Sequence, residues 1–139
     1  MLARTRRVAA AALTVTALAS CSAGAGATAN VLLPSTPYVI TILNYTFDPA
    51  DLSAPPGATV LVKNLDDVDH WLQSSAAPGQ YVHAAVGGLD LDLLVPARDE
   101  RVFSVPADAV VGTVVPYFCF YSRGAMLNQG TITIAAPAG

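Results

Sequence analysis

Hydrophobic and polar residues alternate along much of the chain after residue 37, with the period of two that is typical of strands with one buried face. The pattern is clearest in four segments rich in β-branched and aromatic residues: 38–43, 58–63, 101–105 and 130–134. Turn signals such as Pro55-Pro56-Gly57 separate them. No segment outside the first 20 residues shows a helical period. The pattern therefore predicts an all-β domain, a sandwich or small barrel, with residues 74–88 forming a long loop and at most one turn of helix.

The first 20 residues follow a different pattern, that of an export signal. Arg4, Arg6 and Arg7 precede an apolar run over 8–19. This run is too short to span a bilayer as a resident helix. It ends in Leu-Ala-Ser-Cys at 18–21, which resembles a bacterial lipobox. That resemblance implies cleavage before Cys21, lipidation of its thiol and anchoring at the outer face of the cell membrane. The alternative is an ordinary signal peptide that is cleaved elsewhere.

Composition then divides the rest of the chain. Residues 22–30 are Gly, Ala, Ser, Thr and Asn, which predicts a flexible tether. We therefore expect a signal peptide at 1–20, a lipidated cysteine with its tether at 21–36, and one domain at 37–139. No internal repeat or second domain is predicted.

Processing also changes the charge balance. The 139-residue chain has 7 basic and 10 acidic residues, a net charge of −3. Removal of the signal takes three arginines with it and leaves four cations against ten acids, a net charge of −6. An acidic protein of this kind is not expected to bind nucleic acid.

The two cysteines leave one thiol to explain. If Cys21 carries lipid, Cys119 has no partner within the chain, although the compartment is oxidising. Three interpretations remain open at this stage. Cys119 is a metal ligand, it is a buried free thiol, or Cys21 is not lipidated and pairs with it.

Two longer stretches then resemble a known family. The segment YTFDPADLSAPPGATVLVKNLDDVDHWLQS resembles the first half of the cupredoxins, small copper proteins such as plastocyanin and amicyanin. The segment GTVVPYFCFYSRGAMLNQGTITI resembles their second half, where a Tyr-x-Cys strand leads into a ligand loop and a final strand. Together they cover roughly 38–135. The resemblance implies a Greek-key β-sandwich that holds one copper ion.

It also implies a ligand set with one departure. His70, six residues after Asn64, stands where the family has its first His ligand, Cys119 where it has the thiolate, and Met126 where it has the axial thioether. The family's second His position holds Ser122 instead. A blue-copper site uses two imidazoles with a thiolate and a weak Met, and sulfur ligands favour Cu(I). The departure therefore predicts a preference for Cu(I), unless the remaining histidine, His83, folds over the site from its loop.

These expectations leave several functions open. The resemblance implies an electron-transfer protein. A site with one imidazole and two sulfurs would alternatively store or deliver Cu(I) without redox cycling, and a metal-free sandwich would serve as a binding module. No residues form a nucleophile, base and acid arrangement, so an enzyme is not expected. We expect a monomer that meets a redox or copper-transfer partner protein.

One geometric expectation concerns the strand that carries Cys119. Because strand side chains alternate, Tyr117 and Cys119 share one face, and Phe118 and Phe120 share the other. If Cys119 points into a metal pocket, the two phenylalanines are expected to pack in the core. The acidic residues Asp66, Asp67 and Asp69 and the cation Arg123 are expected to be solvated.

Overall fold

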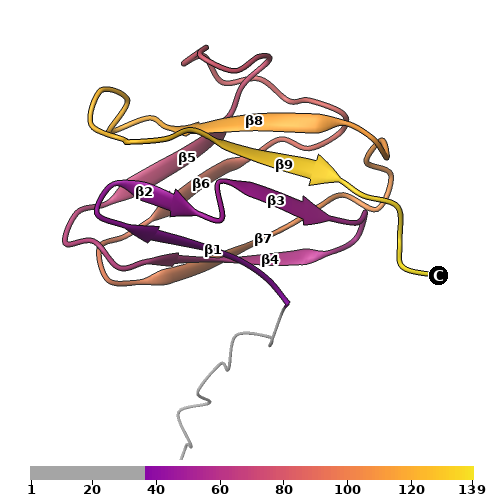
Figure 1. Ribbon diagram of the computed structural model, residues 1–139, viewed down its shortest axis with the longest axis horizontal. Coiled ribbons are helices and arrows are strands. Elements are labelled where there is room, and N and C mark those ends of the chain that lie inside the picture. Colours follow the sequence, from indigo (N-terminus) through magenta and orange to yellow (C-terminus); the bar gives the residue numbers. More distant parts are fainter. Residues whose placement is uncertain (1–36) are drawn as a thin grey trace, which may run out of the picture. The chain divides into compact units, whose positions relative to one another are not determined.

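The computed structural model describes residues 37–139, which form two β-sheets packed face to face (Figure 1). The predicted signal peptide, the predicted lipidation site Cys21 and the predicted tether lie outside the described residues. The strands are β1 (Tyr38–Leu43), β2 (Thr46–Asp48), β3 (Asp51–Ala54), β4 (Thr59–Asn64), β5 (His70–Ser74), β6 (Asp92–Val95), β7 (Glu100–Ser104), β8 (Val114–Cys119) and β9 (Gly130–Ile134). Among residues 37–139, no helix is long and apolar enough to cross a membrane.

The chain passes repeatedly from one sheet to the other. One sheet has the order β2-β1-β4-β7 and the other β3-β9-β8-β5-β6. Pairing is mixed, since β1 runs parallel to β4 and β3 parallel to β9, whereas the other neighbours are antiparallel. The chain changes sheets between β2 and β3 at the cis Asp48–Pro49 peptide. The predicted all-β sandwich is confirmed.

Alternating apolar residues from both sheets form the core. Its fully buried members include Ile40, Ile42, Val60, Val62, Leu72, Val115, Ile132 and Ile134. The four segments predicted from alternation match β1, β4, β7 and β9 to within one residue at each end. Burial of such side chains is the main force that holds the two sheets together.

The long loop after β5 is less open than predicted. It forms no turn of helix, and two isolated bridges, Ser75 with His83 and Val86 with Leu89, tie it down. The N–H of Ala84 also donates to the carbonyl of Ser74 at 3.0 Å. The loop thus continues the path of β5 away from His70.

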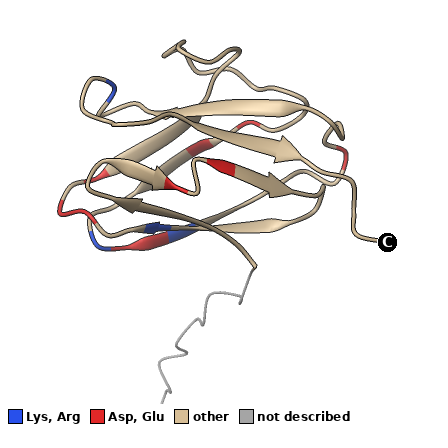
Figure 2. Cartoon of the chain, in the orientation of Figure 1, with Lys and Arg blue, Asp and Glu red and all other residues tan. Residues whose placement is uncertain are grey.

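Charged residues, blue and red in Figure 2, gather where β4 ends and β7 begins. Three of the four cations in residues 37–139 make ion pairs there, Lys63 with Glu100, Arg98 with Asp67 and Arg101 with Asp99. The side chains are well exposed, so each pair contributes little to stability. They mark a polar surface beside the end of the sandwich described next.

Candidate metal centre

The sandwich brings together a histidine and a cysteine that are 49 residues apart. His70 is the first residue of β5 and Cys119 the last residue of β8, and these strands are antiparallel neighbours. Both side chains are almost completely buried, with 0% and 1% of their surface exposed. His70 Nδ1 lies 3.4 Å from Cys119 Sγ. Two of the three predicted metal ligands are therefore in contact.

Asn64 explains the spacing between β4 and His70. This buried side chain donates through Nδ2 to the carbonyls of Val68, Val95 and Pro96 at 2.8, 3.1 and 3.0 Å. Its Oδ1 accepts the N–H of Asp66 at 3.0 Å. The amide thus replaces the ladder partners that the chain loses as it leaves the sheet. It fixes the loop 65–69, which sets the start of β5.

The sulfur of Cys119 lies among hydrogen-bond donors. Burial alone would raise the pKa of this thiol, but His70 and the backbone N–H groups of Trp71 and Ser122 hydrogen-bond to the sulfur, and the pKa falls below its usual value. Hydrogen bonds to the charged form favour it. The thiolate is the form of cysteine that binds metal, so these donors prepare Cys119 for that role.

The imidazole of His70 faces an acid on its other nitrogen. Nε2 lies 2.9 Å from Asp66 Oδ2. Burial alone would lower the pKa of His70, but Cys119 and Asp66 raise it above the usual value. Burial would likewise raise the pKa of Asp66, but N–H groups of Tyr45 and Asn44 and the His70 ring lower it. Nδ1 of His70 and the Cys119 sulfur are close enough to share a proton, and a metal ion bound to both atoms would displace it.

Met126 lies in the loop that connects β8 to β9. Its N–H donates to the carbonyl of Ser122 at 2.8 Å, and the N–H of Ala125 donates to the same oxygen at 2.9 Å. The Met126 side chain is half-buried and packs against the core cluster that includes Cys119. The structure thus keeps the thioether on the side of the loop that faces the core.

Ser122 and His83 occupy different surroundings. The backbone N–H of Ser122 reaches the Cys119 sulfur, which places this residue beside the candidate centre. His83 pairs with Ser75, five residues beyond His70 and about 16 Å along the strand direction. Its Nε2 bonds instead to Asp90 Oδ1 at 2.6 Å. The structure does not bring His83 to the other ligands, because its loop is fixed at the far end of β5.

The separation of the two donor atoms is compatible with a shared metal ion. A nitrogen and a sulfur bound to one ion at distances typical of zinc and at a tetrahedral angle lie roughly 3.5 Å apart. The 3.4 Å between His70 Nδ1 and Cys119 Sγ is compatible with that arrangement as well as with a hydrogen bond. Within residues 37–139, no three His, Cys, Asp or Glu side chains are grouped to hold a metal. Met126 is the remaining predicted donor and packs against the cluster that contains Cys119. One imidazole with two sulfurs is a donor set that suits a soft ion such as Cu(I).

The outer face of the Cys119 strand corrects one prediction. Tyr117 and Cys119 belong to the core cluster, whereas Phe118 packs against Tyr81 outside it at 5.5 Å between ring centroids. Phe120 lies against Trp71 at 5.2 Å. Phe118 is buried, with 2% of its surface exposed, but on the face of the sheet opposite to Cys119, and Phe120 is half-buried on that face. The expectation that both phenylalanines enter the core between the sheets was wrong, because Cys119 itself faces that core.

Further residues of this end of the sandwich were not identified from sequence. Trp71, Phe120 and Tyr121 form an outward-facing aromatic cluster, and Arg123 stacks 4.3 Å above the Phe120 ring rather than facing solvent alone. Asp66 was expected to be solvated and is buried, whereas Asp67 is exposed. The sequence contained a sign of the aromatic cluster. Trp71 directly follows His70 and Phe120 directly follows Cys119, so both aromatic residues are adjacent to predicted ligands.

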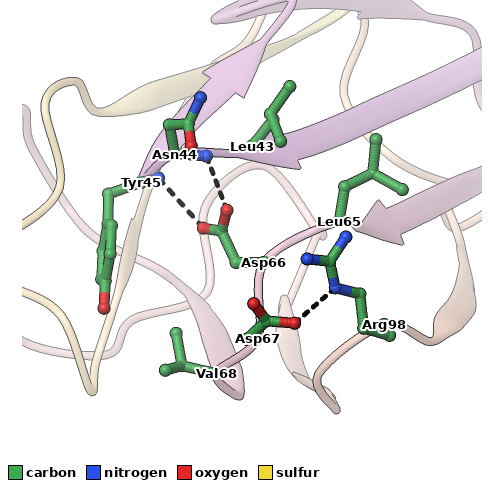
Figure 3. Close-up of a pocket in the computed structure, with 8 residues that line it drawn as sticks. All are labelled: Leu43, Asn44, Tyr45, Leu65, Asp66, Asp67, Val68 and Arg98. Carbon is green, nitrogen blue, oxygen red and sulfur yellow. Dashed lines mark hydrogen bonds and ion pairs between the residues drawn. The ribbon is translucent and has the colours of Figure 1, made fainter.

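A pocket of about 360 Å³ adjoins the candidate centre (Figure 3). Its lining consists of Leu43, Asn44, Tyr45, Leu65, Asp66, Asp67, Val68 and Arg98. Figure 3 shows the Asp66 carboxylate directed at the backbone of Asn44 and Tyr45, with Asp67 and Arg98 paired at the rim. The Tyr45 ring meets the His70 ring edge-on at 5.6 Å. Tyr45 and Asp66 thus separate His70 from the pocket.

Comparison with solved structures identifies the fold. A purple cupredoxin from Nitrosopumilus maritimus matches with a TM-score of 0.52 and 22% identity, over 70% of this chain and 99% of that one. A Cu(I) form of an amicyanin mutant matches with a TM-score of 0.53 and 13% identity, over 74% and 86% of the two chains. A reduced Cu(I) form of a second amicyanin mutant gives 0.52 and 13%, over 75% and 86%.

Sequence comparison adds no relative. No family model matches the chain. No curated protein matches it either. At these identities the structural likeness establishes the cupredoxin fold, and the chemistry of the centre has to be argued from the residues of this chain.

Proposed function

We propose that this chain binds one copper ion through His70, Cys119 and Met126 and transfers electrons. The observation that carries the proposal is the buried contact between His70 Nδ1 and Cys119 Sγ, supported by the cupredoxin fold. Copper bound there would supply the redox chemistry, gaining or losing one electron as a partner protein loses or gains it.

The residues of this chain provide binding, orientation and shielding. Cys119 offers a thiolate whose charge the N–H groups of Trp71 and Ser122 stabilise. His70 offers Nδ1 while Asp66 engages its other nitrogen. Burial of both side chains excludes water from the sulfur, which protects a thiolate against oxidation.

A second candidate function is storage or delivery of Cu(I) without redox cycling. It is favoured by the position of His83, which leaves a single imidazole near Cys119. One imidazole with two sulfurs suits Cu(I) better than Cu(II). We therefore propose that the natural protein takes up Cu(I) more readily than it forms a stable blue Cu(II) centre.

The cellular setting is part of the proposal. We propose export, lipidation at Cys21 and attachment to the outer face of the cell membrane, where a monomer would meet a redox or copper-transfer protein. The role is binding and transfer rather than catalysis, and nucleic acid is not a partner. Changing Cys21 to Ala should release the protein or block its processing. Normal processing and retention of this variant in the membrane fraction would contradict the lipoprotein assignment.

Copper titration with absorption spectroscopy separates the candidates. We expect the natural protein to bind one equivalent of Cu(I) and to show weak visible absorption with Cu(II). Replacing Ser122 by His should add the missing imidazole and produce intense copper–thiolate absorption. His83→Ala is the control, because a distant His83 predicts no change in either metal form. If the natural and Ser122→His proteins both fail to bind copper in either oxidation state, the domain is a metal-free binding module.

A further inference from the structure

We propose that Asp66 is a positioning residue of the candidate copper centre, which holds the His70 ring with Nδ1 toward Cys119 and joins it to the β1–β2 turn. The inference rests on the proposed function, because it assigns a role to a residue outside the ligand set. It starts from an acid that is buried within a loop of three acids.

The orientation of the His70 ring is specified from both sides. Nε2 lies 2.9 Å from Asp66 Oδ2, and Nδ1 lies 3.4 Å from Cys119 Sγ. The side chain has no exposed surface, so water cannot replace either partner. Rotating the ring by half a turn would direct carbon atoms at both partners. The carboxylate therefore selects the orientation that presents Nδ1 to the sulfur.

Asp66 is itself fixed by backbone donors. Oδ1 accepts the N–H of Asn44 at 2.6 Å, and Oδ2 accepts the N–H of Tyr45 at 3.0 Å in addition to the bond with His70. The backbone N–H of Asp66 donates to Asn64 Oδ1 at 3.0 Å. The N–H groups of Asn44 and Tyr45 and the His70 ring together contact both oxygens of the carboxylate. An amide side chain in its place would have only one acceptor oxygen for them. A solvated acid would need none of them.

The turn that Asp66 holds also reaches the ligand loop. Asn44 and Tyr45 form the two-residue connection between β1 and β2 with φ of 50° and 57°. Asn is common in this left-handed region, but Tyr is unusual there and needs support from its surroundings. Asp66 supports Tyr45 at its N–H, and the Tyr45 carbonyl accepts the N–H of Leu127 at 2.8 Å. The carboxylate thus connects His70, through this turn, to the residue next to Met126.

This arrangement has a predictable effect on metal binding. Acids that accept from the second nitrogen of a metal-bound histidine fix its ring and raise its basicity, and their loss typically weakens metal binding about 10- to 100-fold. Asp67 provides a matched comparison, because it is the next residue, carries the same charge, and is 82% exposed in its pair with Arg98. The two variants change the net charge of the loop equally, whereas only Asp66 contacts the His70 ring.

The test compares natural protein, Asp66→Asn and Asp67→Asn, the first of which keeps the size of the side chain and one acceptor oxygen. Nitrogen-15 NMR of the metal-free proteins should show a slowly exchanging proton on His70 Nε2 in natural protein and Asp67→Asn. That proton should exchange faster in Asp66→Asn. Competition with a Cu(I) chelator should give about 10- to 100-fold weaker binding for Asp66→Asn and a change within about twofold for the exposed Asp67→Asn.

The outcomes separate this inference from the proposed function. Equal Cu(I) affinity of natural protein and Asp66→Asn overturns the positioning role alone, as does a natural protein without a protected Nε2 proton. Equal weakening by Asp67→Asn also overturns it, because the effect would then come from charge. A natural protein that takes up no Cu(I) overturns the proposed function, and the role of Asp66 in metal binding with it.

Discussion

Replacing Gly130 by Ala should destabilise the domain through a single contact. Gly130 pairs with Tyr117 across β8 and β9, and an added Cβ would lie 1.9 Å from Tyr117 Cζ and 2.3 Å from Cε1. The ring cannot move away easily, because it is 1% exposed and packs against Phe47 at 4.9 Å between centroids. Overpacking of this kind costs typically about 1–3 kcal/mol. The severity of the clash places Gly130→Ala at the upper end, about 2–3 kcal/mol.

The assay is thermal and urea denaturation of the protein. For a domain of about 100 residues, this loss lowers Tm by roughly 10–20 °C. Gly124→Ala is the control, because a Cβ there meets nothing within 4 Å. Tyr117→Leu removes Cζ and should make the double variant less destabilised than the two single changes added, by about 1 kcal/mol or more. Simple additivity, or a Gly130→Ala protein as stable as Gly124→Ala, would refute the reasoning.

Three further outcomes follow from single buried groups. The Tyr117 hydroxyl is buried without a hydrogen-bond partner among the described residues, so Tyr117→Phe should leave the free energy of unfolding unchanged or raise it by about 1 kcal/mol in urea denaturation; a clear loss would reveal a missing partner. Asn64→Ala removes the contacts of Nδ2 with three backbone carbonyls and of Oδ1 with one N–H, and it should cost about 2–4 kcal/mol by the same assay. A loss no larger than that of an exposed substitution would contradict the role given to Asn64. The pKa of Asp66 in the folded state lies below its ordinary value of 3.8, so the contribution of its ionised form to stability is present above pH 3.8 and is lost as the pH falls through the lower folded pKa. Between neutral pH and about pH 3, the free energy of unfolding should therefore fall less in Asp66→Asn than in the natural protein. Parallel curves of unfolding free energy against pH would argue against this role.

Much of the fold was predictable because four of the strands alternate apolar and polar residues in the sequence, whereas β8, which has six residues, is buried along almost its whole length and shows no alternation. Alternation located β1, β4, β7 and β9, since a period of two is hard to produce in another structure. The short strands β2 and β3 have three and four residues, too few for a pattern to stand out. The approach of His70 to Cys119 was predicted through the family resemblance, not through alternation.

The misjudged residues depended on contacts between distant segments. Asp66 is buried because it accepts hydrogen bonds from the N–H groups of Asn44 and Tyr45, which are 22 and 21 residues away in the sequence. The left-handed conformation of that turn is not predictable from the two residues that form it. Phe118 and Phe120 lie on the face opposite to Cys119, as alternation predicts, but alternation leaves open which of the two faces is the core.

X-ray absorption at the copper edge of the Cu(I)-loaded natural protein tests the central claim most directly. The account predicts one bound copper with one nitrogen and two sulfur neighbours, from His70, Cys119 and Met126, and the loss of one sulfur in Met126→Leu. Coordination by nitrogen and oxygen alone, or a spectrum that is the same in Cys119→Ala, would contradict it.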